Sequence, residues 1–303
     1  MKIYHLKRIF YGIVFECIIK ISMFNLANIL TSCNLICGLT SITFCFAGQL
    51  DLAAYAIFVG ALFDFADGFV ARSLKLESEM GKELDSLSDL ITFGAAPGFL
   101  MFFMILIGIE QPFLLENFDK RAANIYFENY YVFNQFIHWV QAFFYDFPNN
   151  FNASIKYLPF AALSIPFLSL FRLAHFNIDS KQSKNFIGVP TPLNAIIICF
   201  FPLYFNEHMM NWNTQSDLVH AVFDCYTLAG ICCLLSIALI APLPLMSMKL
   251  EGSNKLENYL KIALIIMSVI TIIVFKVLAI PIIITLYLII SIYHYFKTSK
   301  NEI

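Results

Sequence analysis

The sequence predicts an all-α fold, a polytopic bundle of membrane-spanning helices. Hydrophobic residues make up 59% of the 303 residues and charged residues only 13%, and the mean hydropathy is +0.74. A soluble domain of this length does not need so much apolar surface. Long apolar segments also recur at lengths that suit a spanning helix of roughly 20 residues. Because helices satisfy their own backbone hydrogen bonds in lipid, these observations favour an integral membrane protein.

About eight transmembrane helices are expected, of which the first six form the core. The candidate spans are residues 26–47, 51–72, 85–109, 157–176, 191–206, 221–246, 258–275 and 278–296. Residues 24–247 would then be the core, with an outer loop at 110–156, and residues 257–297 an additional hairpin. The outer loop is rich in aromatic and amide residues, a composition typical of an interfacial helix.

The basic residues predict the orientation of these helices. Residues 1–23 carry four Lys and Arg residues among apolar ones, which is typical of an amphipathic helix on the cytoplasmic membrane surface. Fifteen of the 19 basic residues lie on the side of both termini and four on the other side. Since cytoplasmic loops are enriched in Lys and Arg, both termini are expected in the cytoplasm. No basic block indicates nucleic-acid binding.

Residues 62–89 bring acids into this apolar sequence. They include Asp64, Asp67, Asp85 and Asp89. Carboxylates in membrane helices are energetically costly and are therefore candidates for function. The first two share an arc of about 100° on a helix, and the last two are one turn apart. Two helices joined by a polar link at 73–84 would direct all four to one point, where their repulsion requires cations. Such oxygen ligands suit two Mg²⁺ or Mn²⁺ ions.

These acids belong to a longer pattern, D-x2-D-G-x2-A-R-x8-G-x3-D-x3-D. Its fixed positions are Asp64, Asp67, Gly68, Ala71, Arg72, Gly81, Asp85 and Asp89. The pattern resembles, at every position and gap, the signature of the CDP-alcohol phosphotransferases, integral membrane enzymes of phospholipid synthesis. Further segments resemble the bacterial phosphatidylserine synthases of that family: NILTSCNLICGL (28–39), LDSLSDLITFGAAP (84–97), FRLAHFN (171–177) and FIGVPTP (186–192). His175 departs from the subfamily, where a second arginine is expected.

The resemblance implies a reaction and a role for each matching residue. The reaction is transfer of the phosphatidyl group from CDP-diacylglycerol to L-serine, giving phosphatidylserine and CMP. The four acids would bind the two metal ions, and Asp89 would also be the general base. The expected contacts of CDP-diacylglycerol are Gly68, Ala71, Arg72, Ser78, Gly81 and Asn34, while Arg172 would hold the acceptor or a phosphate. The resemblance further implies a homodimer among membrane lipids, in a bacterial inner membrane. The distribution of basic residues predicts that the active site faces the cytoplasm.

Simpler explanations remain open for several of these residues. The two glycines would also allow close helix packing, and polar packing on the first helix would account for Asn34 together with Asn28 and Thr31. Ser78 fits the N-cap of a helix. The two arginines fit positively charged anchors at the membrane surface.

Other functions also remain open at this stage. The core motif does not select the acceptor, so glycerol 3-phosphate, inositol and choline compete with serine. A transporter whose acids conduct cations is a rival of a different class.

Overall fold

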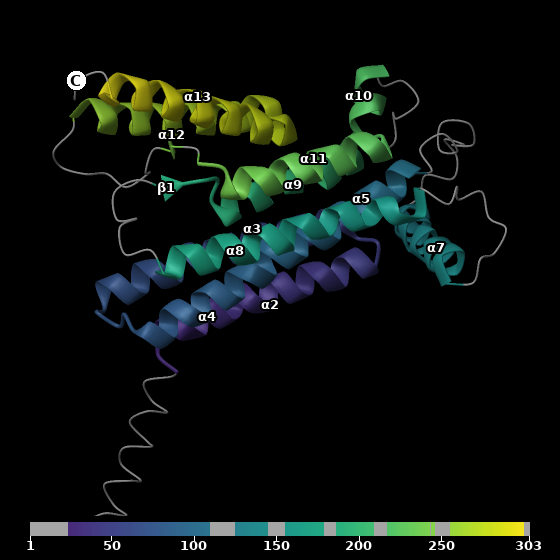
Figure 1. The fold of residues 1–303 in the computed structure, drawn as a ribbon, viewed down its shortest axis with the longest axis horizontal. Coiled ribbons are helices and arrows are strands. Elements are labelled where there is room, and N and C mark those ends of the chain that lie inside the picture. The colour runs from purple at the N-terminus through teal and green to yellow at the C-terminus, as the bar shows by residue number, and fades with distance from the viewer. Residues whose placement is uncertain are drawn as a thin grey trace, which may run out of the picture.

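The computed structural model describes residues 24–109, 125–144, 155–178, 186–208, 217–242, 244–245 and 255–299. The predicted amphipathic helix at residues 1–23 lies outside this part of the chain. Within the described part the structure is almost entirely helical, so the predicted all-α class is confirmed. Long helices run side by side, α2 and the pair α12–α13 lie on opposite sides of the bundle, and α7 lies at one end (Figure 1).

The described residues form sixteen helical and strand elements. In chain order they are α2 (Leu26–Phe46), α3 (Leu50–Ser73), α4 (Glu79–Asp89), the π-helical segment η1 (Leu90–Ala95), α5 (Ala96–Ile109), α7 (Ile125–Phe144), the 3-10 helix η2 (Ile155–Leu163), α8 (Ser164–Ile178), β1 (Phe186–Ile187), α9 (Thr191–His208), α10 (Asp217–Val222), α11 (Cys225–Ile240), β2 (Pro244–Leu245), α12 (Lys255–Phe275), the 3-10 turn η4 (Lys276–Leu278) and α13 (Ala279–Ser299).

Five helical stretches of the described chain are long and apolar enough to cross a membrane. They are Leu26–Phe46, Leu50–Ser73, Glu79–Ile109, Ile155–Ile178 and Lys261–Ser291. The last stretch contains two predicted spans, because the chain turns at Lys276, where φ is 48°, and α12 packs against α13. The remaining two predicted spans correspond to α9 and α11, which fall short of this criterion. The polytopic membrane bundle is therefore confirmed.

Two of the predicted helix boundaries were wrong. The third span was expected to begin at residue 85, whereas α4 begins at Glu79 because Ser78 caps it, accepting a hydrogen bond from Gly81 N at 3.0 Å. The connection from α3 is therefore shorter than the predicted link at 73–84. The sixth span was expected at 221–246, whereas α11 runs from Cys225 only to Ile240. Pro242 forces the preceding residue out of the helical conformation.

α5 lies at the centre of the bundle. Its side chains are apolar all round and nearly all are buried, as expected for a helix surrounded by others. At its far end Phe102 and Phe103 pack against Phe136 and Trp139 of α7. The indole of Trp139 also donates a hydrogen bond to Lys156 O at 2.8 Å. The outer loop thus contains a helix that closes this end, and its place at the membrane surface remains a prediction.

A short pair of strands, which the sequence did not predict, fixes the loop before α9. β1 and β2 pair antiparallel, with Phe186 opposite Leu245. Gly188 follows at a φ of 84°, and a Cβ at this position would lie 2.5 Å from Leu239 O of α11. α13 packs against β2 from the other side. The start of α9 is therefore held by α11 and, through the strands, is connected to the final hairpin.

Candidate functional site

An acidic triad lies where α3 and α4 approach each other. Asp64 and Asp67 come from α3 and Asp85 from α4, and one carboxylate oxygen from each lies within 4.8 Å of those of the other two. Asp67 is buried, and the other two are half-buried. Oδ1 of Asp85 is buried and has no hydrogen-bond partner among the described residues. Three carboxylates this close, one with an unsatisfied oxygen, are the donor set that a divalent cation fits.

Asp89 lies one helical turn beyond the triad. It is the last residue of α4 and is only 8% exposed. Asn34 of α2 donates a hydrogen bond from Nδ2 to Asp89 Oδ1 at 3.1 Å. This bond holds the carboxylate beside the triad, although Asp89 is not one of the three mutually close acids. The fourth acid of the motif is thus close enough to share the site and has a distinct environment.

α2 supports the acids through a polar face. Thr31 donates a hydrogen bond from Oγ1 to Asp67 Oδ2 at 2.6 Å. Ser88, which precedes Asp89, donates to the backbone carbonyl of Thr31 at 3.0 Å. Because the partners are buried, these bonds are shielded from water, so the first fixes the orientation of the Asp67 carboxylate and the second fixes α4 against α2. The polar face of α2 therefore contacts the acidic site directly and does more than pack against the neighbouring helices.

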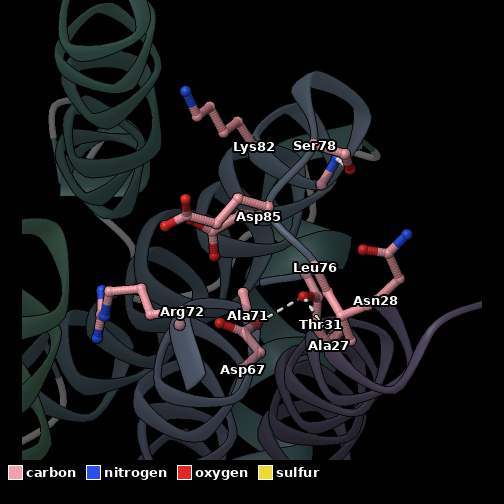
Figure 2. A pocket seen from close by; sticks show the side chains of 13 residues that line it. Ala27, Asn28, Thr31, Asp67, Ala71, Arg72, Leu76, Ser78, Lys82 and Asp85 are labelled. Atoms are coloured by element: carbon pink, nitrogen blue, oxygen red, sulfur yellow. Dashed lines mark hydrogen bonds between the residues drawn. The ribbon is translucent and has the colours of Figure 1, made fainter. Parts of the chain in front are cut away.

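A small cavity of about 150 Å³ opens beside the triad, between α2, α3 and α4 (Figure 2). Five of the six residues expected to bind CDP-diacylglycerol line it: Gly68, Ala71, Arg72, Ser78 and Gly81. Asp67 and Asp85 face this space, with Arg72 and Lys82 at its edges (Figure 2). Asn34, the sixth residue, does not line the cavity and is fully buried against Asp89.

The glycines and Ser78 of the small cavity differ in what they contribute. A Cβ at Gly81 would lie 3.1 Å from Ser78 Oγ and 3.3 Å from Asn28 Oδ1, so a side chain there would crowd the lining. A Cβ at Gly68 would make only ordinary contact with the Arg72 guanidinium, at 3.6 Å. Ser78 is the N-cap of α4, as the simpler explanation held, and it also lines the cavity.

A large cavity of about 960 Å³ adjoins the acids between α4, α8 and the start of α9. Asp85 and Lys82 line both cavities, while Asp89 and Arg172 line only this one. Arg172 Nε and the hydroxyl of Thr191 are buried at its wall, and the part of the chain that the structure describes offers neither of them a hydrogen-bond partner. The acids of α4 therefore stand between a small cavity and a large one, an arrangement suited to a reaction that joins two substrates.

Comparison with known proteins identifies the part of the chain that builds the acidic site. Residues 24–115 match the family model described as CDP-alcohol phosphatidyltransferase. These residues form a CDP-alcohol phosphatidyltransferase domain. The domain contains α2 to α5, and with them all four acids and the whole lining of the small cavity. The α8 and α9 wall of the large cavity lies beyond the matched residues of this phosphatidyltransferase domain.

Several curated proteins resemble a longer part of the chain. It is 27% identical over 177 residues to the CDP-diacylglycerol–serine O-phosphatidyltransferase of Bacillus subtilis, covering 58% of this chain and 75% of that protein. The protein of the same name in Helicobacter pylori strain 26695 is 26% identical over 191 residues, covering 62% of each chain. The archaetidylserine synthase of Methanothermobacter thermautotrophicus is 27% identical over 184 residues, covering 60% of this chain and 59% of that protein.

Some residues at the site were not singled out from the sequence. Lys82 lines both cavities, Thr191 lines the large one, and Ser88 and Thr92 bond to the backbone of α2. Thr31 was noticed only for its place on a polar helix face. A polar residue repeated every third position of an apolar helix is a usable signal, whereas Thr191 follows a long loop and gives none.

Proposed function

We propose that this protein transfers the phosphatidyl group of CDP-diacylglycerol to L-serine, with release of CMP. The observation that carries the proposal is an acidic triad whose Asp85 lines two cavities at once, one of them also lined by the motif residues of a phosphatidyltransferase domain. Relatives named for serine transfer or for archaetidylserine synthesis support serine as the acceptor.

The small cavity would take the cytidine diphosphate head. Arg72 at its edge can pair with phosphate oxygens, because a guanidinium matches their geometry. Asp64, Asp67, Asp85 and Asp89 would hold two Mg²⁺ or Mn²⁺ ions. When bound, these ions neutralise negative charge on the phosphoryl oxygens and on departing CMP.

Asp89 would act as the general base. Its carboxylate takes the proton from the serine hydroxyl while that oxygen bonds to the phosphorus carrying diacylglycerol. The bond from this phosphorus to the CMP oxygen breaks, so CMP leaves with the electron pair. A carboxylate is a weak base for an alcohol, so proton removal should be concerted with attack. Asn34 keeps the acceptor oxygen of Asp89 in place by its hydrogen bond.

The large cavity would take serine. Arg172 at its wall can bind the serine carboxylate, and Glu79 and Glu83 at its rim offer partners for the ammonium group. A cavity with both charges matches a zwitterion better than choline, inositol or glycerol 3-phosphate, which carry only one sign of charge or none.

The decisive experiment is CMP release from CDP-diacylglycerol by purified protein with Mn²⁺ or Mg²⁺, with and without L-serine. We expect release that requires serine, stops with EDTA and resumes when metal is restored. A panel of glycerol 3-phosphate, inositol and choline is the control for the acceptor. Release that ignores serine and follows another alcohol would replace the substrate, and no release with any acceptor would refute the proposal.

The role of Asp89 has its own test. The Asp89→Asn variant should lose at least about 100-fold in turnover, the usual contribution of a general base, while CDP-diacylglycerol binding largely survives. Turnover and binding of the radiolabelled lipid would be measured on the same preparation. Near-normal turnover would remove Asp89 from the mechanism.

The setting of the enzyme is part of the proposal. We place it as a homodimer in a bacterial cytoplasmic membrane, on the resemblance to the bacterial phosphatidylserine synthases. The distribution of basic residues supports an active site and both termini that face the cytoplasm. Labelling of cysteines introduced near the α3–α4 connection in intact cells and in inverted vesicles would test the orientation, since only the inverted vesicles should be labelled by an impermeant reagent.

A further inference from the structure

Thr92 lies at a point where three helices meet. It belongs to η1, the π-helical segment that begins directly after Asp89, and its side chain is fully buried. A Cβ at Gly38 of α2 would lie 2.7 Å from Thr92 Cα, and a Cβ at Gly60 of α3 would lie 2.6 Å from Thr92 Cγ2. Neither helix could approach this closely with a larger residue. The two glycines thus form a socket into which Thr92 fits.

The hydroxyl of Thr92 connects this socket to the acidic site. It donates a hydrogen bond to the backbone carbonyl of Asn34 at 2.8 Å, across to α2. A buried threonine in a helix often bonds instead to a carbonyl one turn earlier in its own helix. The side chain of the same Asn34 donates to Asp89 Oδ1 at 3.1 Å. Asp89, Thr92 and Asn34 therefore close a ring of one helical segment and two hydrogen bonds.

Gly60 lies against two members of this ring, Thr92 and Asn34. A Cβ there would lie 3.1 Å from Asn34 Oδ1 as well as 2.6 Å from Thr92 Cγ2. The socket therefore sets the position of the asparagine amide together with that of the threonine. The Asn34 amide donates a hydrogen bond to Asp89. A shift of the socket that moves this amide would therefore also move the Asp89 carboxylate.

We propose that Thr92 is a positioning residue for Asp89, acting through Asn34 and seated in the socket of Gly38 and Gly60. It does not touch substrate. It fixes the register of α4 against α2, so that the Asn34 amide meets the Asp89 carboxylate. The catalytic role of Asp89 rests on the proposed function. The link from Thr92 to Asp89 rests only on the hydrogen bonds and close approaches described above.

The hydroxyl and the methyl group of Thr92 can be separated by substitution. Thr92→Val keeps the shape and removes the hydrogen bond, and should lower kcat about tenfold while KM for CDP-diacylglycerol and the melting temperature stay near wild type. Thr92→Ser keeps the hydroxyl and should retain most of kcat. Thr43→Val is the matched control, because Thr43 is exposed and bonds only within α2.

The socket is tested by a rescue. Gly60→Ala should lower kcat, because its new Cβ meets Thr92 Cγ2. Combining it with Thr92→Ser removes that methyl group and should restore part of kcat. Loss in the double variant equal to the sum of the two single losses would mean that the socket does not act through Thr92.

A binding measurement separates this inference from the proposed function. Mn²⁺ affinity, followed by electron paramagnetic resonance without substrates, should fall in Thr92→Val and not in Thr92→Ser. The inference is overturned if Thr92→Val has wild-type kcat and wild-type Mn²⁺ affinity, or if Thr92→Ser is as impaired as Thr92→Val. If wild-type protein releases no CMP but its Mn²⁺ affinity still depends on the hydroxyl, the proposed function fails and the positioning of Asp89 stands.

Discussion

The two cavities beside α4 are built in different ways. The small cavity is surrounded by residues from one continuous part of the chain, and its Asp67 is held by a 2.6 Å hydrogen bond from Thr31. The large cavity brings together α4, α8 and the start of α9, and two buried polar groups at its wall, on Arg172 and Thr191, have no partner within the described segments. Asp67 of the small cavity is thus oriented before any ligand binds, whereas Arg172 and Thr191 of the large one, like Asp85 in the wall that both cavities share, carry groups whose partners a ligand can supply.

This difference matches the two substrates that the proposal assigns. A phosphatidyltransferase domain that accepts one nucleotide-linked lipid can keep a rigid site for it, encoded within residues 24–115. The proposed acceptor side lies partly outside that domain, and its charged residues would distinguish one alcohol from another. Variants of a residue that lines both cavities should therefore affect both substrates, and variants of a residue that lines one cavity should affect only one substrate.

The largest effect is expected from the wall that both cavities share. Asp85→Asn removes an acid of the triad and should reduce turnover about 1,000-fold, because developing phosphoryl charge loses its stabilisation. Mn²⁺ binding should weaken in parallel, measured by electron paramagnetic resonance. Asp51→Asn, in the first turn of α3 and outside both cavities, is the matched control. Normal Mn²⁺ binding in Asp85→Asn would rule out the triad as the metal site.

The next effect should separate the cavities. Arg72→Gln should raise KM for CDP-diacylglycerol, and Arg172→Gln should raise KM for serine, each about 10- to 100-fold, because each removes a charged hydrogen bond to one substrate. Steady-state kinetics with each substrate varied in turn would measure both constants, and each variant serves as the control for the other. If both arginines alter the same KM, the assignment of one substrate to each cavity is wrong.

A smaller effect should come from the support of the small cavity. Thr31→Val removes the 2.6 Å hydrogen bond to Asp67 and should weaken Mn²⁺ binding about tenfold, a usual cost for losing a group that orients a metal ligand. Thr31→Ser keeps the hydroxyl and should bind Mn²⁺ as the wild type does. Equal affinities in all three proteins would show that Asp67 needs no such support.

The smallest effect on catalysis should come from Gly188, which precedes the lining residues Pro190 and Thr191 of the large cavity in the chain. Gly188→Ala places a Cβ against Leu239 O at a positive φ, which should reduce stability by about 1–3 kcal/mol. Thermal unfolding in detergent would measure this loss, and KM for serine should change more than KM for CDP-diacylglycerol. Gly230→Ala is the control, since nothing lies within 4 Å of its added Cβ. A larger change in KM for the lipid would contradict the separation of the cavities.

The same contrast explains what could be predicted from the sequence. The acids and the small cavity lie in one helix–turn–helix segment, where helical spacing alone brings Asp64 and Asp67 to one face and Asp85 to the facing helix. The large cavity depends on α8 and α9, whose approach to α4 is a matter of tertiary packing that local spacing does not encode. Arg172 was identified only by resemblance, and Thr191 was not identified at all.

The wrong start of the third helix and the missed pair of strands each have a local cause. The first turns of α4 are polar, so their helical character was hidden in a segment that looked like a link, and only the cap at Ser78 marks the true start. The pairing of β1 with β2 involves two residues on each side, too few for strand propensity to register. The spans of α2, α3 and α9 were predicted well because each combines an apolar run with clear ends.

The π-helical segment η1 has a consequence for the rotational phase of the long helix that it interrupts. Residues before it aim acids at α3, and residues after it aim small side chains at α8, where a Cβ at Gly98 would lie 2.9 Å from Pro166. Each residue of a helix turns its successor by about 100°, so deleting one residue from this segment would rotate all of α5 by that angle relative to α4. Either the catalytic half or the packing half of the helix would then face the wrong neighbours. A π-helical turn holds one residue more than an α-helical turn, and this added residue lets the acids face α3 while the small side chains face α8.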